Sequence, residues 1–272
     1  MTSPTALLDA AVAAARAAAG VVRAAADDLG SIEVRAKQPG DFVTQVDLAS
    51  ERAIVQTLLG AFPSHAVRSE ESVDAHGTPG ADHVWIVDPL DGTTNFIHGY
   101  PAYAVSIALA VRGRVEVGVV LDVVRGDVFH AVCGGGAFRN AQRLAVAQRT
   151  ALQDAIVATS CPPRAGAGLE RSMQLLGTVL QRAHAIRRSG SAALDLAWVA
   201  AGHCDAQFDL GLNAWDVAAG GLLVREAGGT VSDFSGDADF LERRECVASN
   251  PALHAELRAI LAPFSARAAS PN

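Results

Sequence analysis

The stretch Trp85-Ile-Val-Asp-Pro-Leu-Asp-Gly-Thr-Thr-Asn-Phe96 decides how this 272-residue chain is interpreted. The apolar run from Val84 to Val87 predicts a buried strand that ends at Asp88-Pro89. Two carboxylates, those of Asp88 and Asp91, therefore stand three residues apart at the end of a strand. Pro89 keeps the residue before it extended, and Gly92 permits a backbone turn that a side chain would hinder.

The residues after the two carboxylates are suited to binding a phosphate. Thr93, Thr94 and Asn95 are typical of a helix start, where free backbone N–H groups can hold an anion. The Leu90 carbonyl lies between the acids, and hard cations such as Mg²⁺ prefer carboxylate and carbonyl oxygens. The stretch predicts a metal–phosphate site; the alternative is a surface turn with two solvated acids.

Two other types of site with closely spaced acids do not fit. A calcium-binding EF-hand loop that began at Asp88 would require an acid where Gly99 stands. Phosphotransferases of the haloacid-dehalogenase type carry Asp-x-Asp-Gly-Thr, with one residue between the acids instead of two. They also require a lysine further along the chain, and the only lysine here is Lys37.

Other acids stand where they could join the same site. Asp47 closes the segment 41–47, Glu70 and Glu71 follow a predicted strand over 65–69, and Asp216 lies in the first turn of a predicted helix. Taken singly, each could be a solvated loop charge or a helix cap. Their occurrence together favours a shared site.

The first half of the chain predicts helices over 6–29, closed by Gly30, and over 45–59, stopped by Gly60. Polar loops are expected over 36–41 and 71–82. Strands are expected over 65–69, 84–87, 103–111, 115–124 and 128–132. Because no helix separates the last of these strands, we expect an antiparallel sheet.

The second half alternates between strands and helices, which is typical of a more parallel α/β sheet. The predicted order is strand 155–159, helix 168–183, strand 184–187, helix 191–201, strand 204–209, helix 214–227 and strand 229–233, with a further helix starting at Asn250-Pro251. The fold class is therefore α/β (α+β), with two sheets in one domain over 1–272. Its halves are roughly 1–145 and 146–265, and residues 266–272 form a frayed tail.

Composition limits the partners of the chain. The formal net charge is −7, and 50% of the residues are apolar. An acidic balance argues against a nucleic-acid backbone or a membrane surface as the main partner. The four cysteines are far apart and are expected as reduced, mostly buried thiols in a cytoplasmic protein. No signal peptide is evident, and no apolar run is expected to reach membrane-spanning length.

Taken in order, these motifs resemble the inositol monophosphatase family, and most closely its bacterial SuhB-type members. The resemblance runs along nearly the whole chain. It rests on the segments 41–47, 70–72, 85–96, 190–197 and 215–220. It implies alternating layers in the order α-β-α-β-α and a lithium-sensitive, Mg²⁺-dependent phosphatase that forms a homodimer. The substrate would be a small phosphate monoester, hydrolysed by metal-activated water without a covalent intermediate.

The resemblance also implies a role for each matching residue. Metal ligands would be Glu70, Asp88, the Leu90 carbonyl, Asp91 and Asp216, for two Mg²⁺ ions, with Asp47 holding a third through water. Glu70 and Thr93 would orient the attacking water. The substrate would be held by Leu90, Asp91, Gly92, Thr93, Gly190, Ser191, Ala192 and Asp209.

Three positions depart from the family pattern. Ser69 replaces a common Gly, Ala214 replaces a common Pro, and Asp209 replaces the Glu that contacts inositol. Because Asp is shorter by one methylene, we expect longer or water-mediated bonds to sugar hydroxyls. Myo-inositol monophosphate is the first choice of substrate. Histidinol phosphate, fructose bisphosphate, NADP, adenosine bisphosphate and a transcription-linked binding role stay open.

Overall fold

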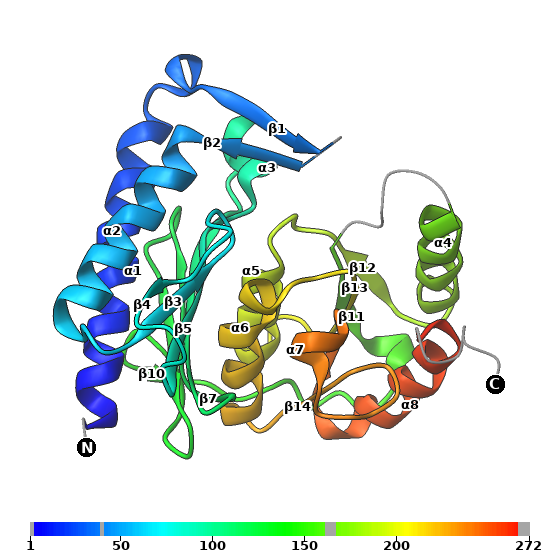
Figure 1. Cartoon of the computed structure of the whole chain (residues 1–272). Coiled ribbons are helices and arrows are strands. Elements are labelled where there is room, and N and C mark those ends of the chain that lie inside the picture. The colour runs from blue at the N-terminus through cyan, green and yellow to red at the C-terminus, as the bar shows by residue number, and fades with distance from the viewer. Residues whose placement is uncertain (1–2, 39–40, 161–166, 266–272) are drawn as a thin grey trace.

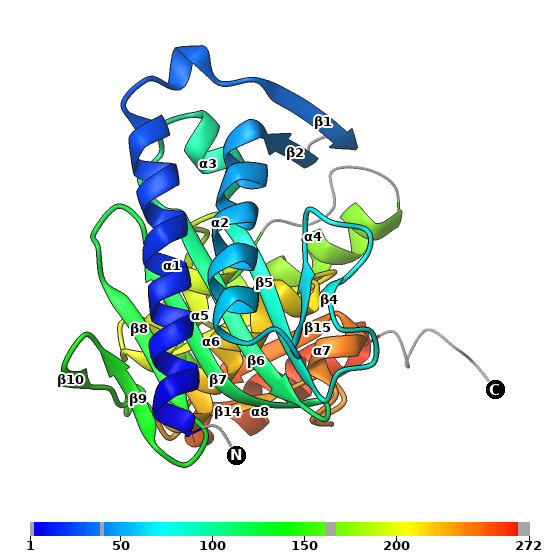
Figure 2. The same cartoon turned by 60° about the vertical axis from the view of Figure 1, so that its left-hand side comes forward.

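The computed structural model describes residues 3–38, 41–160 and 167–265, and its helices and sheets form five alternating layers (Figure 1). The first layer is a pair of helices, α1 (Pro4–Ala26) and α2 (Gln45–Ala61), which lie on one face of a large sheet (Figure 2). Both helices were expected. α1 ends before the predicted boundary, and α2 continues past Gly60 because a glycine is tolerated inside a helix.

α1 corrects one expectation. It has 23 residues, and an 18-residue window in it has a mean hydropathy of 1.5, so it is long and apolar enough to cross a membrane by length and composition. The expectation that no run reaches that length was wrong. One face of the helix packs into the core between α2 and the sheet through Leu7, Ala11, Ala14, Ala15, Ala18, Ala19 and Val22.

The second layer is an eight-stranded sheet. Its spatial order is β10 (Gln142–Arg143), β9 (Gly136–Arg139), β8 (Val128–Val132), β7 (Arg114–Asp122), β6 (Ala104–Val111), β5 (His83–Asp91), β3 (Ala66–Ser69) and β4 (His76–Gly77). The strand pairs are antiparallel, apart from the parallel pair β3–β5. The antiparallel sheet is confirmed, and β4 lies where a loop was expected.

The third layer consists of α5 (Ala192–Ala200) and α6 (Ala214–Glu226), which pack between the two sheets. Nearly every residue of α5 is buried, since a helix enclosed by sheets on both sides has no solvent face. The carboxylate of Glu226, at the end of α6, accepts hydrogen bonds of 2.8 Å from the backbone N–H groups of Gly134 and Gly136. These bonds join the glycine-rich turn at 134–136 to the end of α6.

The fourth layer is a five-stranded mixed sheet. Its spatial order is β12 (Ala185–Arg187), β11 (Ile156–Ala158), β13 (Ala206–Leu210), β15 (Glu245–Ser249) and β14 (Thr230–Ser232). β11 is parallel to both of its neighbours, and β15 is antiparallel to both of its own. β15 was not predicted. The fifth layer is α4 (Ala167–Leu180) and α8 (Pro251–Leu261), which cover the outer face.

The short elements complete the chain. α3 (Thr93–Ile97) follows β5, α7 (Phe240–Arg243) precedes β15, and 3₁₀ turns occur at Leu29–Ser31, Leu152–Asp154 and Ala262–Phe264. β1 (Val34–Gln38) and β2 (Asp41–Thr44) form an antiparallel pair where a polar loop was expected. Each strand has too few residues to show a clear period in the sequence, so only the pairing reveals them.

Candidate active site

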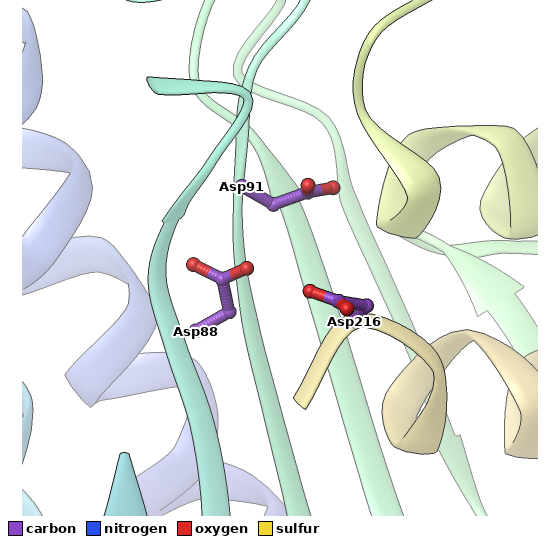
Figure 3. Close-up of side chains that lie close together, drawn as sticks. All are labelled: Asp88, Asp91 and Asp216. Atoms are coloured by element: carbon purple, nitrogen blue, oxygen red, sulfur yellow. The ribbon is translucent and has the colours of Figure 1, made fainter. Parts of the chain in front are cut away.

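β5 ends in a β-bulge, which decides the direction of the two acids of the central motif. Asp88 pairs with Ser106 of β6, but Asp91 pairs with Ala104, so β5 has one residue more than β6 between these pairs. In a regular strand, residues three apart point to opposite faces. The extra residue brings Asp88 and Asp91 to the same side (Figure 3). The strand therefore includes both acids instead of ending at Asp88-Pro89.

Asp88, Asp91 and Asp216 point toward one another between the eight-stranded sheet and the middle helices (Figure 3). One carboxylate oxygen from each lies within 4.8 Å of the others, close enough to share a metal ion. Asp216 stands in the first turn of α6, where its Oδ2 accepts a 2.6 Å hydrogen bond from the backbone N–H of Asn213. This bond anchors the start of the helix although Ala214 replaces the common Pro.

The electrostatics of the three acids favour a cation. Burial, and then the charges of Glu70, Asp91 and Asp216, raise the pKa of Asp88 well above its usual range. Burial raises the pKa of Asp91 to about 6, although hydrogen bonds from Ser191 and Ala193 lower it. Burial and the charge of Asp91 likewise raise the pKa of Asp216 well above its usual range. Because a bound divalent ion relieves such repulsion, the donor set fits a hard metal ion.

Glu70 reaches this group from the neighbouring parallel strand. β3 and β5 run in the same direction, and the backbone N–H of Glu70 donates a 3.1 Å hydrogen bond to the Val87 carbonyl. The carboxyl ends of parallel strands meet at one sheet edge, which places Glu70 beside Asp88. Ser69 is the last residue of β3 and its φ is not positive, so the backbone there does not require a glycine.

Asp47 is both a helix cap and a neighbour of the motif. Its Oδ2 accepts hydrogen bonds from the Thr44 backbone N–H at 2.9 Å and the Thr44 hydroxyl at 2.5 Å. Its Oδ1 lies 2.9 Å from the Thr93 hydroxyl, which is also 3.1 Å from the Leu90 carbonyl. Burial raises the pKa of Asp47. The start of α2 is thus joined to the start of α3.

Two glycines with positive φ hold the turn after β5 against the loop before α5. Gly92 has φ +98°, and a Cβ there would lie 3.0 Å from the Ala102 carbonyl. Gly190 has φ +87°, and a Cβ there would lie 2.7 Å from Asn95 Nδ2. That amide donates to the carbonyls of Ala102 at 2.6 Å and Ser189 at 2.8 Å. A side chain at either position would strain the positive-φ backbone and crowd these neighbours.

The predicted substrate segment 190–192 lies directly beside Asp91. The Ser191 hydroxyl donates a 2.6 Å hydrogen bond to Asp91 Oδ2, and the backbone N–H of Ala193 donates to the same oxygen at 2.7 Å. Ser191 also caps α5, and Ala192 is its first residue. The two halves of the chain therefore meet at Asp91.

Asp209 stands on β13 of the second sheet, and protein donors surround its carboxylate. It accepts hydrogen bonds from the Ser160 backbone N–H at 2.5 Å, Gln207 Nε2 at 2.7 Å, the Thr159 hydroxyl at 3.2 Å and the Ser160 hydroxyl at 3.3 Å. Burial raises its pKa to about 6, although these bonds lower it. A substrate hydroxyl would have to compete with these donors, so contact with the substrate stays a prediction.

The sequence did not single out several residues that support the site. Ser50 and Glu51 on α2, and Ser160 and Gln207 around Asp209, were not given roles. Asn95 was named only as part of a helix start, and its bonds to Ala102 and Ser189 were not foreseen. Sequence spacing could have pointed only to Ser50 and Glu51, which lie three and four residues after Asp47 and so share its face of the helix. Of the cysteines, Cys204 and Cys246 are buried and Cys133 is exposed, while Cys161 lies outside the described residues. Burial raises the pKa of Cys204 to about 12, which does not suit a nucleophile.

Comparisons with known proteins agree with this geometry. The model of the inositol monophosphatase family matches residues 3–265. A protein of Pseudomonas aeruginosa named Nus factor SuhB is 46% identical over 247 residues, which cover 90% of this chain and 91% of that protein.

Solved structures show the same arrangement. The extragenic suppressor protein SuhB of Bartonella henselae matches with a TM-score of 0.90 and 38% identity, over 94% of this chain and 98% of that one. An inositol monophosphatase from Anabaena matches with a TM-score of 0.80 and 32% identity, over 93% and 94%. The expected mixed α/β fold is confirmed.

Proposed function

The chain belongs to the inositol monophosphatase family, and on this premise we propose that it is a Mg²⁺-dependent phosphomonoesterase. The proposed substrate is myo-inositol monophosphate or a related polyol phosphate. The observation that carries the proposal is the convergence of Asp88, Asp91 and Asp216 beside a turn, at Gly92, that the fold constrains tightly. The family supports a phosphatase, and the acid trio supports metal dependence.

The proposed metal ligands are Glu70, Asp88, the Leu90 carbonyl, Asp91 and Asp216, for two Mg²⁺ ions. Asp47 would hold a third ion through water. With Asp47 counted, five carboxylates carry a charge of −5, which two Mg²⁺ ions would reduce to −1 and a third would invert to +1. The acidic composition of the chain is therefore compatible with a phosphate substrate.

In the proposed reaction, water attacks phosphorus, a new P–O bond forms, and the bond to the alcohol oxygen breaks. One proton of the water ends on the departing oxygen, so the products are the alcohol and inorganic phosphate. Bound Mg²⁺ would supply charge neutralisation and lower the pKa of water. Glu70 and Thr93 would orient that water, and the Thr93 hydroxyl is already held by Asp47. The backbone N–H groups of Gly92 and Thr93 would hold the phosphate, and the segment 190–192 would line the alcohol. Asp209 is the proposed substrate-side acid.

The experiment that tests this proposal is a phosphate-release panel with purified protein at fixed Mg²⁺. The panel includes inositol, histidinol, sugar, NADP and adenosine phosphates. We expect the highest kcat/KM for inositol monophosphate and complete loss of activity with a chelator. Turnover that persists in the chelator would contradict the mechanism. A strong preference for a non-polyol would move the substrate assignment elsewhere in the family. We also propose inhibition by lithium, a homodimer and a cytoplasmic location.

A second function has one specific observation in its favour. The Pseudomonas relative carries the name Nus factor, which points to a role linked to transcription. Such a role would run beside hydrolysis, since the acid trio is intact. Replacing Asp88 with Asn separates the two: a cellular phenotype that survives the loss of phosphatase activity assigns the physiological role to binding.

A further inference from the structure

One turn of α2 contacts three separate parts of the proposed site. Asp47, Ser50 and Glu51 lie at positions i, i+3 and i+4, so their side chains share one face of the helix. Asp47 reaches Thr93, as described above. The Ser50 hydroxyl donates a 2.7 Å hydrogen bond to the Pro89 carbonyl, inside the bulge between Asp88 and Asp91. Glu51 reaches the loop that follows Glu70.

Glu51 makes the least expected of these contacts. Its residue surface is only 5% exposed, which is costly for a carboxylate unless it is hydrogen-bonded. Oε1 accepts a hydrogen bond from the Ser72 hydroxyl and lies 3.5 Å from His76 Nε2. The same His76 nitrogen lies 2.9 Å from the Ser72 hydroxyl oxygen. A buried acid on α2 thus accepts a hydrogen bond from Ser72 in the loop and lies close to His76 at the start of β4.

That loop carries Glu70. At its start, the Glu70 backbone is bonded to Val87, and at its end, β4 pairs with β3. Between these points Val73 and Asp74 are exposed, so the core does not pack around this part of the loop. Ser72, two residues after Glu70, is the loop residue that is hydrogen-bonded to Glu51 of α2.

We propose that Glu51 is a positioning residue that acts through Ser72 to fix the carboxylate of Glu70 for metal binding. The inference rests on the proposed function, because it assumes that Glu70 is a ligand. Glu51 shares its helix turn with Asp47 and Ser50. In this proposal α2 therefore fixes how far Asp47 lies from Glu70, just after β3, and from the two acids of β5. Such partners keep a ligand in its binding orientation before the ion arrives.

A structural role alone makes a different prediction. If Glu51 only stabilised the fold, its loss would lower the unfolding temperature without changing the response to metal. A positioning role instead lowers the apparent Mg²⁺ affinity and leaves kcat at saturating Mg²⁺ little changed, since added metal restores the occupied site. The split between metal affinity and kcat therefore separates the two roles.

The experiment compares Glu51→Ala, Ser72→Ala, the double variant and Glu51→Gln with the wild type. Mg²⁺ affinity is measured by calorimetry without substrate and by activation of phosphate release. We expect Glu51→Ala and Ser72→Ala each to lower Mg²⁺ affinity about tenfold. The double variant should be no worse than either, because one contact is lost in all three. Glu51→Gln should recover most of the affinity, since its amide oxygen can accept from Ser72.

Glu256→Ala, at an exposed position on α8, is the matched control and should bind Mg²⁺ like the wild type. Two outcomes would overturn this inference and leave the proposed function standing. They are an unchanged Mg²⁺ affinity in Glu51→Ala and Ser72→Ala, and losses of affinity that add fully in the double variant. If Glu51→Ala does not fold, Ser72→Ala on the part-exposed loop decides. A wild-type protein that binds no Mg²⁺ would overturn the proposed function and this inference together.

Discussion

The acid trio beside the eight-stranded sheet and Asp209 on the five-stranded sheet are held in different ways. At the eight-stranded sheet, Asp88 and Asp216 each accept one backbone hydrogen bond among the described contacts, and they face each other and Asp91. At the five-stranded sheet, Asp209 accepts four hydrogen bonds from Thr159, Ser160 and Gln207. Asp91 accepts two hydrogen bonds, from Ser191 and Ala193, so the two sites differ in the number of donors for each carboxylate and in the negative charges that face it.

The difference shows how to distinguish a site from a structural acid. A buried carboxylate must be compensated by hydrogen bonds, by a cation or by a proton. Four hydrogen bonds from protein donors hold Asp209, although burial still raises its pKa to about 6. In the acid trio each carboxylate has fewer donors and faces two other acids, and this mutual repulsion favours compensation by a bound cation.

The largest effect is expected for Asp88→Asn. Phosphate release should fall by about 10³-fold, because Asp88 is a proposed Mg²⁺ ligand and the proposed hydrolysis depends on bound Mg²⁺. The metal-free protein should become more stable, since one of three repelling acids is neutralised. Each kcal/mol of repulsion removed should raise the unfolding temperature in a chelator by about 2–4 °C. An equal loss of activity with a lower unfolding temperature would contradict the contrast.

The next effect is that apparent Mg²⁺ affinity and the stability of the metal-free protein change with pH in opposite directions. Mg²⁺ and protons compete for the trio, so apparent Mg²⁺ affinity should fall as the pH falls, by about tenfold per pH unit for each proton displaced. Asp91 joins the competing groups as the pH drops below about 6. Without metal, the stability contributed by Asp91 is fully present below its usual pKa of 3.8 and is lost as the pH rises through about 6.

Calorimetric titration with Mg²⁺ from pH 5 to 8 measures the first change, and thermal unfolding in a chelator over the same range measures the second. The pH values are chosen to bracket the pKa of about 6 given above. The trio would be excluded as the metal site if Mg²⁺ affinity stayed constant across this range.

The smallest effect is expected for Asp209→Asn. Its amide group would place a donor against Ser160 or Gln207, and a buried polar group left without a partner costs about 1–3 kcal/mol. We expect a lower unfolding temperature with and without Mg²⁺, and an unchanged Mg²⁺ requirement. A variant that kept its stability but lost Mg²⁺ activation would instead place Asp209 with the trio.

Much of the fold could be predicted because each half of the chain has its own pattern. Consecutive apolar runs without helices indicated the antiparallel sheet, and the later alternation indicated the mixed one. The weak points were short strands such as β1 and β2, and the unpredicted β15, whose partners lie far away in the sequence. The helix at α1 was predicted, and only its apolar length was underestimated, since an alanine-rich core helix and a membrane span have similar composition.

The sequence by itself determined which residues form the motif, and it placed Asp88 and Asp91 beside a turn that requires Gly92. It could not determine their direction, because residues three apart on a strand point to opposite faces and only the bulge against β6 reverses this. Nor could it show that Asp209 is surrounded by donors while Asp216 faces two acids. Contacts between side chains depend on which distant strands and helices meet, and only the tertiary structure decides that.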